Sequence, residues 1–322
     1  MSDPMTAPAR DDDAFTRISE TGLRDGLQVE KTILPVADKL RLIEALLDAG
    51  LTRIEVTGFV NPKVVPQFAD AVELCAALPR RPGVAYAAFV PNLKGAERAV
   101  AAGLDEVKVG GAVSESFNRL NVRMSNAQVR DTIRDIASML QGTGTRMVGV
   151  VATAFGCPYE GAVPLGQVVE EFDRLVGHGA RLIYLADTTG VADPSLIRER
   201  VAALKDRAPG VTLGLHLHDT RGLGLANALA GHAAGVRDFE GSIAGLGGCP
   251  FAPLAVGNVC TEDLVHMLHR MGVPTGLDLA ALLRAARMAQ GMLGRDLPGM
   301  VMKAGPADQR HDAETRAPLP AA

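Results

Sequence analysis

Short apolar segments alternate along the chain with longer segments in which apolar residues recur at helical spacing. The apolar segments predict eight β-strands, at residues 15–20, 52–59, 83–90, 104–110, 145–155, 181–187, 211–219 and 236–245. Between them, segments such as 36–50 and 164–180 predict amphipathic helices. Several helices are followed by a glycine suited to close them, at Gly50, Gly103, Gly179 and Gly235.

This alternation predicts an α/β protein, a (β/α)8 TIM barrel with its active site at the C-terminal ends of the strands. An open, doubly wound sheet is the alternative. A barrel commonly uses roughly 200–250 residues as one domain, which suits a chain of 322 residues. We expect the catalytic domain, with C-terminal helices, at residues 15–300. Residues 1–14 and 301–322 are rich in charge, alanine and proline, which predicts a disordered N-terminal tail and a flexible C-terminal tail.

Composition narrows the expected partners. The formal net charge is −4 and both signs are well mixed, which gives no reason to expect a nucleic acid or a membrane surface as partner. A small-molecule site is therefore expected. The four cysteines are far apart and form no CxxC pair, and the chain has neither a signal segment nor an apolar run of about 18 residues. These features predict a cytoplasmic protein with reduced thiols.

Polar and ionisable residues gather at the predicted C-terminal ends of the strands, where barrel enzymes carry their catalytic groups. They are Arg24 and Asp25 after the first strand, Glu55 late in the second, Asp187 at the end of the sixth, His216 and His218 at the end of the seventh, and Cys249 and Asn258 after the eighth. Strands that close into one barrel would bring these residues to one rim.

The two histidines indicate a metal site. Residues i and i+2 of a strand share a face about 7 Å apart, so His216 and His218 can reach one ion. A carboxylate from Asp25 and an amide oxygen from Asn258 would complete a shell of nitrogen and oxygen ligands. Such a shell suits Mg²⁺ or Mn²⁺, and the lack of thiolate ligands argues against a structural zinc site. The alternative is a pair of strand-end histidines hydrogen-bonded to the backbone.

Arg24 and Cys249 suggest the chemistry at this rim. The Arg24 guanidinium is suited to stabilise negative charge on a carbonyl oxygen as a carbon–carbon bond breaks, and its alternative role is a structural ion pair with Glu55 or Asp187. Cys249 follows glycines in a loop and is suited to transfer a proton, although cysteine is most often a small buried residue. Lys108 lacks the apolar surroundings that would make it a Schiff-base lysine.

Several motifs resemble those of 3-hydroxy-3-methylglutaryl-CoA lyases, which belong with isopropylmalate and homocitrate synthases to the metal-dependent barrel lyases. They are RDGLQVEK (24–31), IEVTGFVNPKVVPQ (54–67), FGCPYEG, DTTGV, HLHDT, SIAGLGGCPF and GNVCTEDLV, and they run across nearly the whole predicted barrel. The resemblance implies a retro-Claisen cleavage of an acyl-CoA substrate to acetyl-CoA and a 3-oxoacid. It also implies a homodimer.

The resemblance also implies roles for single residues. The implied metal ligands are Asp25, His216, His218 and Asn258, and Glu262 would hold a metal-bound water. Arg24 is the implied catalytic arginine, Cys249 would protonate the departing product, Glu55 and Asp187 would be acidic site residues, and the general base is His216 or a neighbouring carboxylate. The expected substrate-binding positions are Gln28, Lys31, Tyr159, Tyr184 and Gly58, of which Lys31 would meet the CoA phosphates.

Three positions depart from the pattern of these lyases. Leu23 replaces a proline before the arginine, and Gly58 and Tyr184 replace serines. Tyr184 would narrow the pocket if it pointed inward. Alternative substrates are therefore another 3-hydroxy-3-alkylacyl-CoA, a citramalyl-CoA-like thioester, or a free keto-hydroxyacid cleaved by a metal-dependent aldolase. The complete set of polar rim residues argues against a barrel that has lost turnover and serves as a binding protein.

Overall fold

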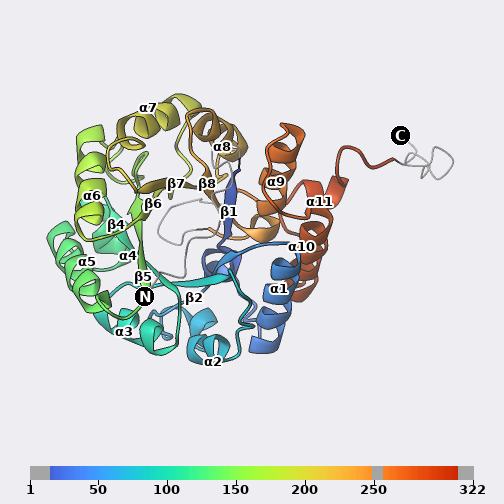
Figure 1. Cartoon of the computed structure of the whole chain (residues 1–322), viewed down its shortest axis with the longest axis horizontal. Helices are drawn as coiled ribbons and strands as arrows, with labels where there is room; N and C mark the ends of the chain where they lie inside the picture. The colour runs from blue at the N-terminus through green and yellow to red at the C-terminus, as the bar shows by residue number, and fades with distance from the viewer. Residues whose placement is uncertain (1–14, 249–256, 311–322) are drawn as a thin grey trace, which may run out of the picture.

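The computed structural model describes residues 15–248 and 257–310, and within these ranges eight parallel strands form a closed barrel (Figure 1). The strands are β1 (Arg17–Glu20), β2 (Arg53–Gly58), β3 (Ala85–Phe89), β4 (Glu106–Ala112), β5 (Arg146–Ala152), β6 (Leu182–Asp187), β7 (Thr212–Leu217) and β8 (Asp238–Gly241). Because β1 pairs with β8 as well as with β2, the sheet has no edge. The predicted TIM barrel is confirmed, and the open sheet is excluded.

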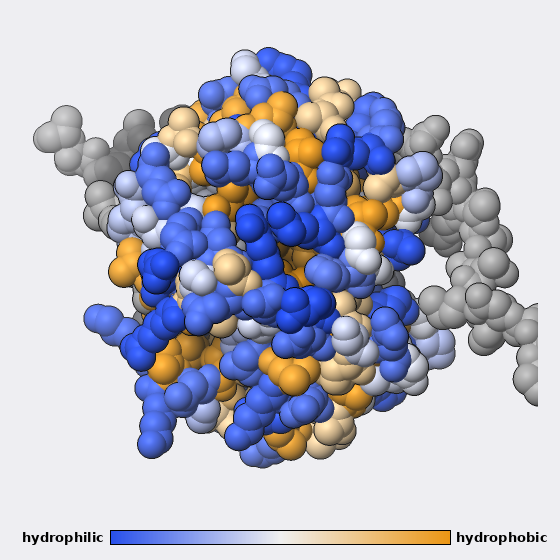
Figure 2. Space-filling model, turned by 90° about the vertical axis from the view of Figure 1, so that its left-hand side faces the viewer, coloured by the Kyte–Doolittle hydropathy of each residue, from blue (hydrophilic) through white to orange (hydrophobic). Residues whose placement is uncertain are grey.

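Helices surround the barrel (Figure 1). They are α1 (Val36–Asp48), α2 (Ala71–Ala76), α3 (Leu93–Ala101), α4 (Glu115–Asn121), α5 (Asn126–Leu140), α6 (Leu165–Gly177), α7 (Pro194–Leu204), α8 (Gly224–Ala233), α9 (Thr261–Arg270), α10 (Leu279–Leu293) and α11 (Val301–Ala304). Most of them pack on the strands, whereas α10 and α11 pack on other helices. Figure 2 shows the side of the barrel on which α5 and α6 lie, and its surface is mainly hydrophilic. Among the described residues, no helix is both long and apolar enough to cross a membrane.

The helix ends follow the sequence signals. Gly50 and Gly179 follow α1 and α6 with backbone φ angles of 97° and 95°. Residues that have a Cβ atom rarely adopt such positive φ angles. At the start of α5, the Ser125 side chain accepts from the Gln128 backbone while the Gln128 side chain accepts from the Ser125 backbone. These local signals set where each helix begins and ends, and so where the neighbouring strands begin and end.

The packed structure continues beyond residue 300, where the flexible tail was expected to begin. Helix α11 (Val301–Ala304) buries Met302 and packs against α9 and α10. Both oxygens of the Asp263 carboxylate accept from backbone N–H groups, those of Met300 and Val301. The last helix is therefore attached to α9 by charge-assisted hydrogen bonds.

Candidate metal centre and active site

A cavity of about 130 Å³ lies at the C-terminal ends of the strands. The polar residues that line it include Arg24, Asp25, Gln28, Glu55, Lys108, His216, His218 and Glu240. A larger cavity of about 630 Å³ lies at the opposite mouth of the barrel, where the strands begin, and no predicted site residue in the described ranges lines it. Charged residues line both cavities, but only the smaller one lies at the C-terminal ends of the strands and is lined by predicted site residues, so we place the functional site there.

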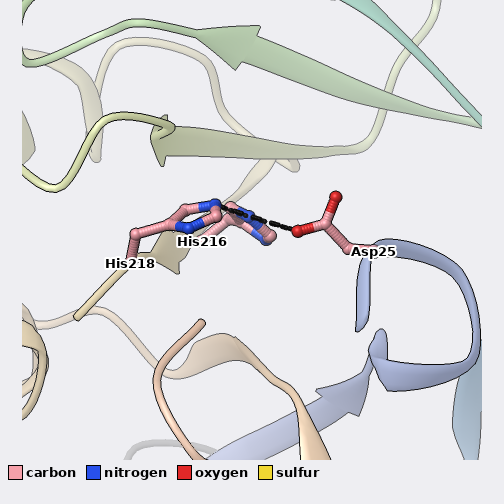
Figure 3. A group of neighbouring side chains, drawn as sticks. All are labelled: Asp25, His216 and His218. Atoms are coloured by element: carbon pink, nitrogen blue, oxygen red, sulfur yellow. Dashed lines mark hydrogen bonds and ion pairs between the residues drawn. The ribbon is translucent and has the colours of Figure 1, made fainter. Parts of the chain in front are cut away.

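His216 and His218 meet Asp25 at the edge of this cavity (Figure 3). The Nε2 atoms of the two histidines are 3.2 Å apart, and the Asp25 Oδ2 atom lies 3.8 Å from each of them. The histidines come from β7 and the residue after it, and Asp25 comes from the single helical turn Gly22–Gly26 after β1. Three groups of ligand type therefore lie within reach of one ion.

Asn258 lies beside Asp25 and offers a further atom of ligand type. Its Nδ2 atom donates to Asp25 Oδ2 at 2.8 Å and to the Leu246 carbonyl at 3.3 Å. Its Oδ1 atom is buried and has no hydrogen-bond partner within the described ranges. An unsatisfied buried oxygen beside a carboxylate and two imidazoles fits a hard divalent cation, which is bound by oxygen and imidazole nitrogen.

The Glu240 carboxylate orients His216. Glu240 Oε2 lies 2.7 Å from His216 Nδ1 and accepts its hydrogen, so the lone pair of the Nε2 atom faces His218 and Asp25. Burial raises the pKa of Glu240, but Lys108 and His216 outweigh burial and hold it at about 2. Burial also raises the pKa of Asp25, and there Arg24 and the two histidines hold it at about 2. Both carboxyl groups are therefore ionised at neutral pH.

Arg24 contacts two carboxylates and an aromatic ring. Its guanidinium bonds to Asp25, and its Nε atom lies 3.1 Å from Glu55 Oε1. The guanidinium carbon lies 4.4 Å from the centre of the Phe89 ring. The alternative ion pair with Glu55 is thus present, and the side chain still lines the cavity. A guanidinium held from two sides offers its remaining donors in a fixed direction.

Lys108 and Glu240 were not among the predicted site residues. The Lys108 ammonium lies between Glu55, at 2.8 Å, and Glu240. Burial lowers the pKa of Lys108, but the two carboxylates outweigh burial and raise it, which excludes the neutral amine that a Schiff-base lysine needs. A signal was available in the sequence, because charged residues inside predicted barrel strands are buried and must pair with one another.

Asp187 lies outside the cavity lining. Its carboxylate accepts from the backbone N–H groups of Val191 and Ala192 and so holds the loop between β6 and α7. Burial raises its pKa to about 6 against those hydrogen bonds and against the charge of His216. Of the expected substrate contacts, Gln28 lines the cavity, whereas Lys31 and Tyr159 are exposed and lie outside its lining.

Tyr184 and Gly58 also lie outside the cavity lining. Tyr184 points into the barrel but is fully buried, and its hydroxyl bonds to Asp238 and to Ser19 Oγ at 3.0 Å. Asp238 begins β8 and faces the opposite mouth of the barrel, so the Tyr184 ring lies beneath the site. The Phe68 ring fills the space beside the Gly58 backbone, and a Cβ atom at position 58 would lie 3.2 Å from that ring. Neither residue narrows the pocket.

Glu262 is in the first turn of α9, and its side chain meets the short helix η4 (Ile243–Gly245). Its Oε2 atom accepts from the Ala244 backbone N–H at 3.0 Å, and its side chain is hydrogen-bonded to Cys260. Burial raises the pKa of Glu262 to about 7, and these hydrogen bonds oppose the shift. Cys75, Cys157 and Cys260 are buried free thiols. Cys249 lies outside the described residues.

Comparisons with known proteins point to one family. The HMGL-like family model matches residues 16–289. The (R)-citramalyl-CoA lyase of Chloroflexus aurantiacus is 42% identical over 90% of this chain and 94% of its own, and the mitochondrial hydroxymethylglutaryl-CoA lyase of Mus musculus is 43% identical over 89% of each. A solved HMG-CoA lyase of Acinetobacter baumannii, in complex with coenzyme A and 3-methylmalate, matches with a TM-score of 0.90 at 41% identity, over 93% of this chain and 98% of its own.

Proposed function

This chain belongs to the HMGL-like family, and from that premise we propose that it is a divalent-metal-dependent lyase that cleaves 3-hydroxy-3-methylglutaryl-CoA to acetyl-CoA and acetoacetate. The observation that carries the proposal is the meeting of Asp25, His216 and His218 beside Arg24 in one cavity. Lyases of this name are 38–43% identical over most of the chain, which supports the same reaction.

The metal would be Mg²⁺ or Mn²⁺, held by Asp25, His216, His218 and Asn258. When bound, such a cation supplies Lewis-acid stabilisation of negative charge on oxygen and a fixed point for two neighbouring substrate oxygens. Imidazole nitrogens and hard oxygens suit these two ions, and no thiolate belongs to the set. We place Glu262 behind the set, because its side chain is hydrogen-bonded to the Ala244 backbone and to Cys260.

The chain's own residues account for the charge and proton movements. A base removes the proton of the substrate's tertiary hydroxyl, the C2–C3 bond breaks, and its electron pair moves onto the thioester carbonyl. Arg24 is positioned to stabilise the enolate oxygen that results. Both ring nitrogens of His216 are committed, Nδ1 to Glu240 and Nε2 to the metal position, so a neighbouring carboxylate is favoured as the base. Cys249 would return a proton to the carbon of the enolate.

A second substrate is favoured by one specific relative. The (R)-citramalyl-CoA lyase of Chloroflexus aurantiacus is as similar to this chain as the hydroxymethylglutaryl-CoA lyases are. The same bond cleavage of citramalyl-CoA gives acetyl-CoA and pyruvate. The metal and the bond cleavage would be common to both reactions, and only the group carried on the tertiary carbon differs.

The testing experiment offers both thioesters to the purified protein with Mn²⁺. Release of acetoacetate from 3-hydroxy-3-methylglutaryl-CoA, abolished by His216→Ala, is the expected result. Release of pyruvate alone would move the assignment to the citramalyl-CoA substrate. No product from either thioester, with Mn²⁺ still bound, would contradict both assignments and direct the search to other 3-hydroxy-3-alkylacyl-CoA compounds.

The Cys249→Ala variant tests the aldolase alternative. A lyase that protonates its product through this thiol should lose most of its kcat, since general acid catalysis contributes about 10²–10⁴-fold. An aldolase acting on a free keto-hydroxyacid has no need of the thiol and would keep its activity. The homodimer is also part of the proposal, and light scattering of the same protein measures it.

A further inference from the structure

Six side chains around the metal position form a closed ring in which acidic and basic groups alternate. In order, they are Asp25, Arg24, Glu55, Lys108, Glu240 and His216, which returns to Asp25. Arg24 bonds to Asp25, and Lys108 bonds to Glu240. The other four distances between neighbouring charged atoms are 3.1 Å from Arg24 to Glu55, 2.8 Å from Glu55 to Lys108, 2.7 Å from Glu240 to His216 and 3.8 Å from His216 to Asp25. Each member of the ring is thus held from two sides.

Lys108 is the ring member opposite the metal position. It stands on β4, is 3% exposed, and joins Glu55 of β2 to Glu240 of β8 across the interior of the barrel. Its two carboxylate partners lead to different parts of the site. Glu240 leads to the metal ligand His216, and Glu55 leads to Arg24.

We infer that Lys108 is a positioning residue that keeps Glu240 against His216 and Glu55 against Arg24. The metal side of this inference stands on its own, and the substrate side rests on the proposed lyase function. Without the ammonium, two buried carboxylates would face each other with no cation between them. Like charges repel strongly where water is excluded, so one of the carboxylates would turn away from its partner. His216 would then lose the hydrogen bond that fixes its ring.

The first test is the Mn²⁺ affinity of Lys108→Met, measured by calorimetry with no substrate present. Methionine keeps the length of the side chain and removes its charge. We expect Mn²⁺ to bind about 10–100-fold more weakly, the usual effect of losing a group that orients a ligand. Lys108→Arg, which keeps the charge, should recover most of the affinity. Wild-type affinity in a folded Lys108→Met protein would overturn the inference.

Lys39→Met is the matched control. Lys39 is also a buried lysine, 1% exposed, and its ammonium bonds to Asp70 at 2.7 Å and to the Gln67 carbonyl. It does not line the site cavity. Lys39→Met should lower the thermal unfolding temperature yet leave the Mn²⁺ affinity unchanged. An equal loss of affinity in both variants would mean that any loss of a buried lysine loosens the barrel, and Lys108 would have no special role.

A charge-balanced double variant covers the case in which Lys108→Met does not fold. Lys108→Met/Glu55→Gln removes one cation and one anion together, so Glu240 no longer faces a second carboxylate. Its Mn²⁺ affinity should return to within about threefold of the wild type, although Glu55 is lost for catalysis. A double variant that binds Mn²⁺ as weakly as Lys108→Met is one contrary result, and a double variant that also fails to fold is the other. Either result would contradict the idea that repulsion between Glu55 and Glu240 causes the loss.

A metal-free measurement separates this inference from the proposed function. In the apoprotein, ¹⁵N NMR of the imidazoles reports whether His216 carries its hydrogen on Nδ1. We expect that hydrogen on Nδ1 in the wild type and in Lys39→Met, and a mixture of tautomers in Lys108→Met. If neither thioester is cleaved by the wild type, these results still decide the role of Lys108. If His216 keeps its Nδ1 hydrogen in every variant, the inference fails even where lyase activity is found.

Discussion

The Nε2 atoms of His216 and His218 are hydrogen-bonded to one another at 3.2 Å. When His216 is neutral and donates its Nδ1 hydrogen to Glu240, the Nε2 atom of His216 is the acceptor and that of His218 is the donor. A cation bound between the rings needs a lone pair from both Nε2 atoms. Binding must therefore displace one hydrogen from the Nε2 atom of His218.

Mn²⁺ should stabilise the wild-type protein against heat, and His218→Ala should abolish the effect. A ligand that binds only the folded state at about 100 times its dissociation constant adds about 2.7 kcal/mol to the free energy of unfolding. Differential scanning calorimetry with Mn²⁺ and with a chelator measures the shift. His232→Ala, on a helix outside the cavity lining, is the control and should keep the full shift. A shift that persists in His218→Ala would place the metal elsewhere.

Arg24→Lys should lower kcat about 10²–10³-fold and change KM little. The guanidinium is hydrogen-bonded to Asp25, forms an ion pair with Glu55 and still lines the cavity, and a lysine ammonium cannot hold both carboxylates in the same geometry. Steady-state kinetics on the cleaved thioester measures both constants. The matched control is Arg80→Lys, because Arg80 also lies over an aromatic ring, that of Tyr86, but far from the cavity lining. Equal losses in both variants would remove the special role of Arg24.

Glu262 should make the protein less stable as the pH rises. Burial raises the pKa of Glu262 to about 7 in the folded state, against 4.5 for the unfolded chain. Its contribution to stability is therefore fully present below pH 4.5 and is lost as the pH rises through 7. The loss should be on the order of 2–3 kcal/mol. Glutamine is uncharged at every pH, so Glu262→Gln should remove this part of the pH dependence.

The measurement is urea unfolding of the wild type and of Glu262→Gln at intervals from pH 5 to 8. The difference between their free energies of unfolding should fall steadily as the pH increases. Glu170→Gln on α6, which replaces an exposed carboxylate, should run parallel to the wild type. A constant difference between wild type and Glu262→Gln would show that Glu262 is ionised throughout the range.

The strands and the grouping of the candidate metal-binding residues could be predicted from the sequence, because both depend on local order. Seven of the eight strands lie within the predicted ranges, and β4 ends two residues beyond its range, at Ala112. A closed parallel barrel brings the C-terminal ends of the strands together whatever the details of packing. Asp25, His216, His218 and Asn258 follow from that geometry. The pairing of Lys108 with Glu240 does not, because it depends on which inward residues of β4 and β8 lie at the same height in the barrel.

Tyr184 illustrates the same limit. Its alternation along β6 predicts an inward side chain, but only the stagger of the strands decides how far below the rim the ring lies. In the structure it lies at the level of Ser19 and Asp238, and Lys108 is 5.5 Å above the ring centre. The substituted serine position was therefore a sound reason to question the substrate, yet the tyrosine does not reach the cavity lining.

Tyr184→Phe should lower stability and leave substrate preference unchanged. The variant removes the hydroxyl that bonds to Ser19 and Asp238, both buried, and an unsatisfied buried polar group costs about 1–3 kcal/mol. The ratio of kcat/KM for the 3-hydroxy-3-methylglutaryl and citramalyl thioesters should stay as in the wild type. Tyr86→Phe is the matched control, because the buried Tyr86 hydroxyl donates to the Pro79 carbonyl well outside the cavity lining. A tenfold change of this ratio in Tyr184→Phe, but not in Tyr86→Phe, would show that Tyr184 contacts the substrate. The two substrates share the metal and the bond cleavage, so only a residue that contacts the acyl group can discriminate between them.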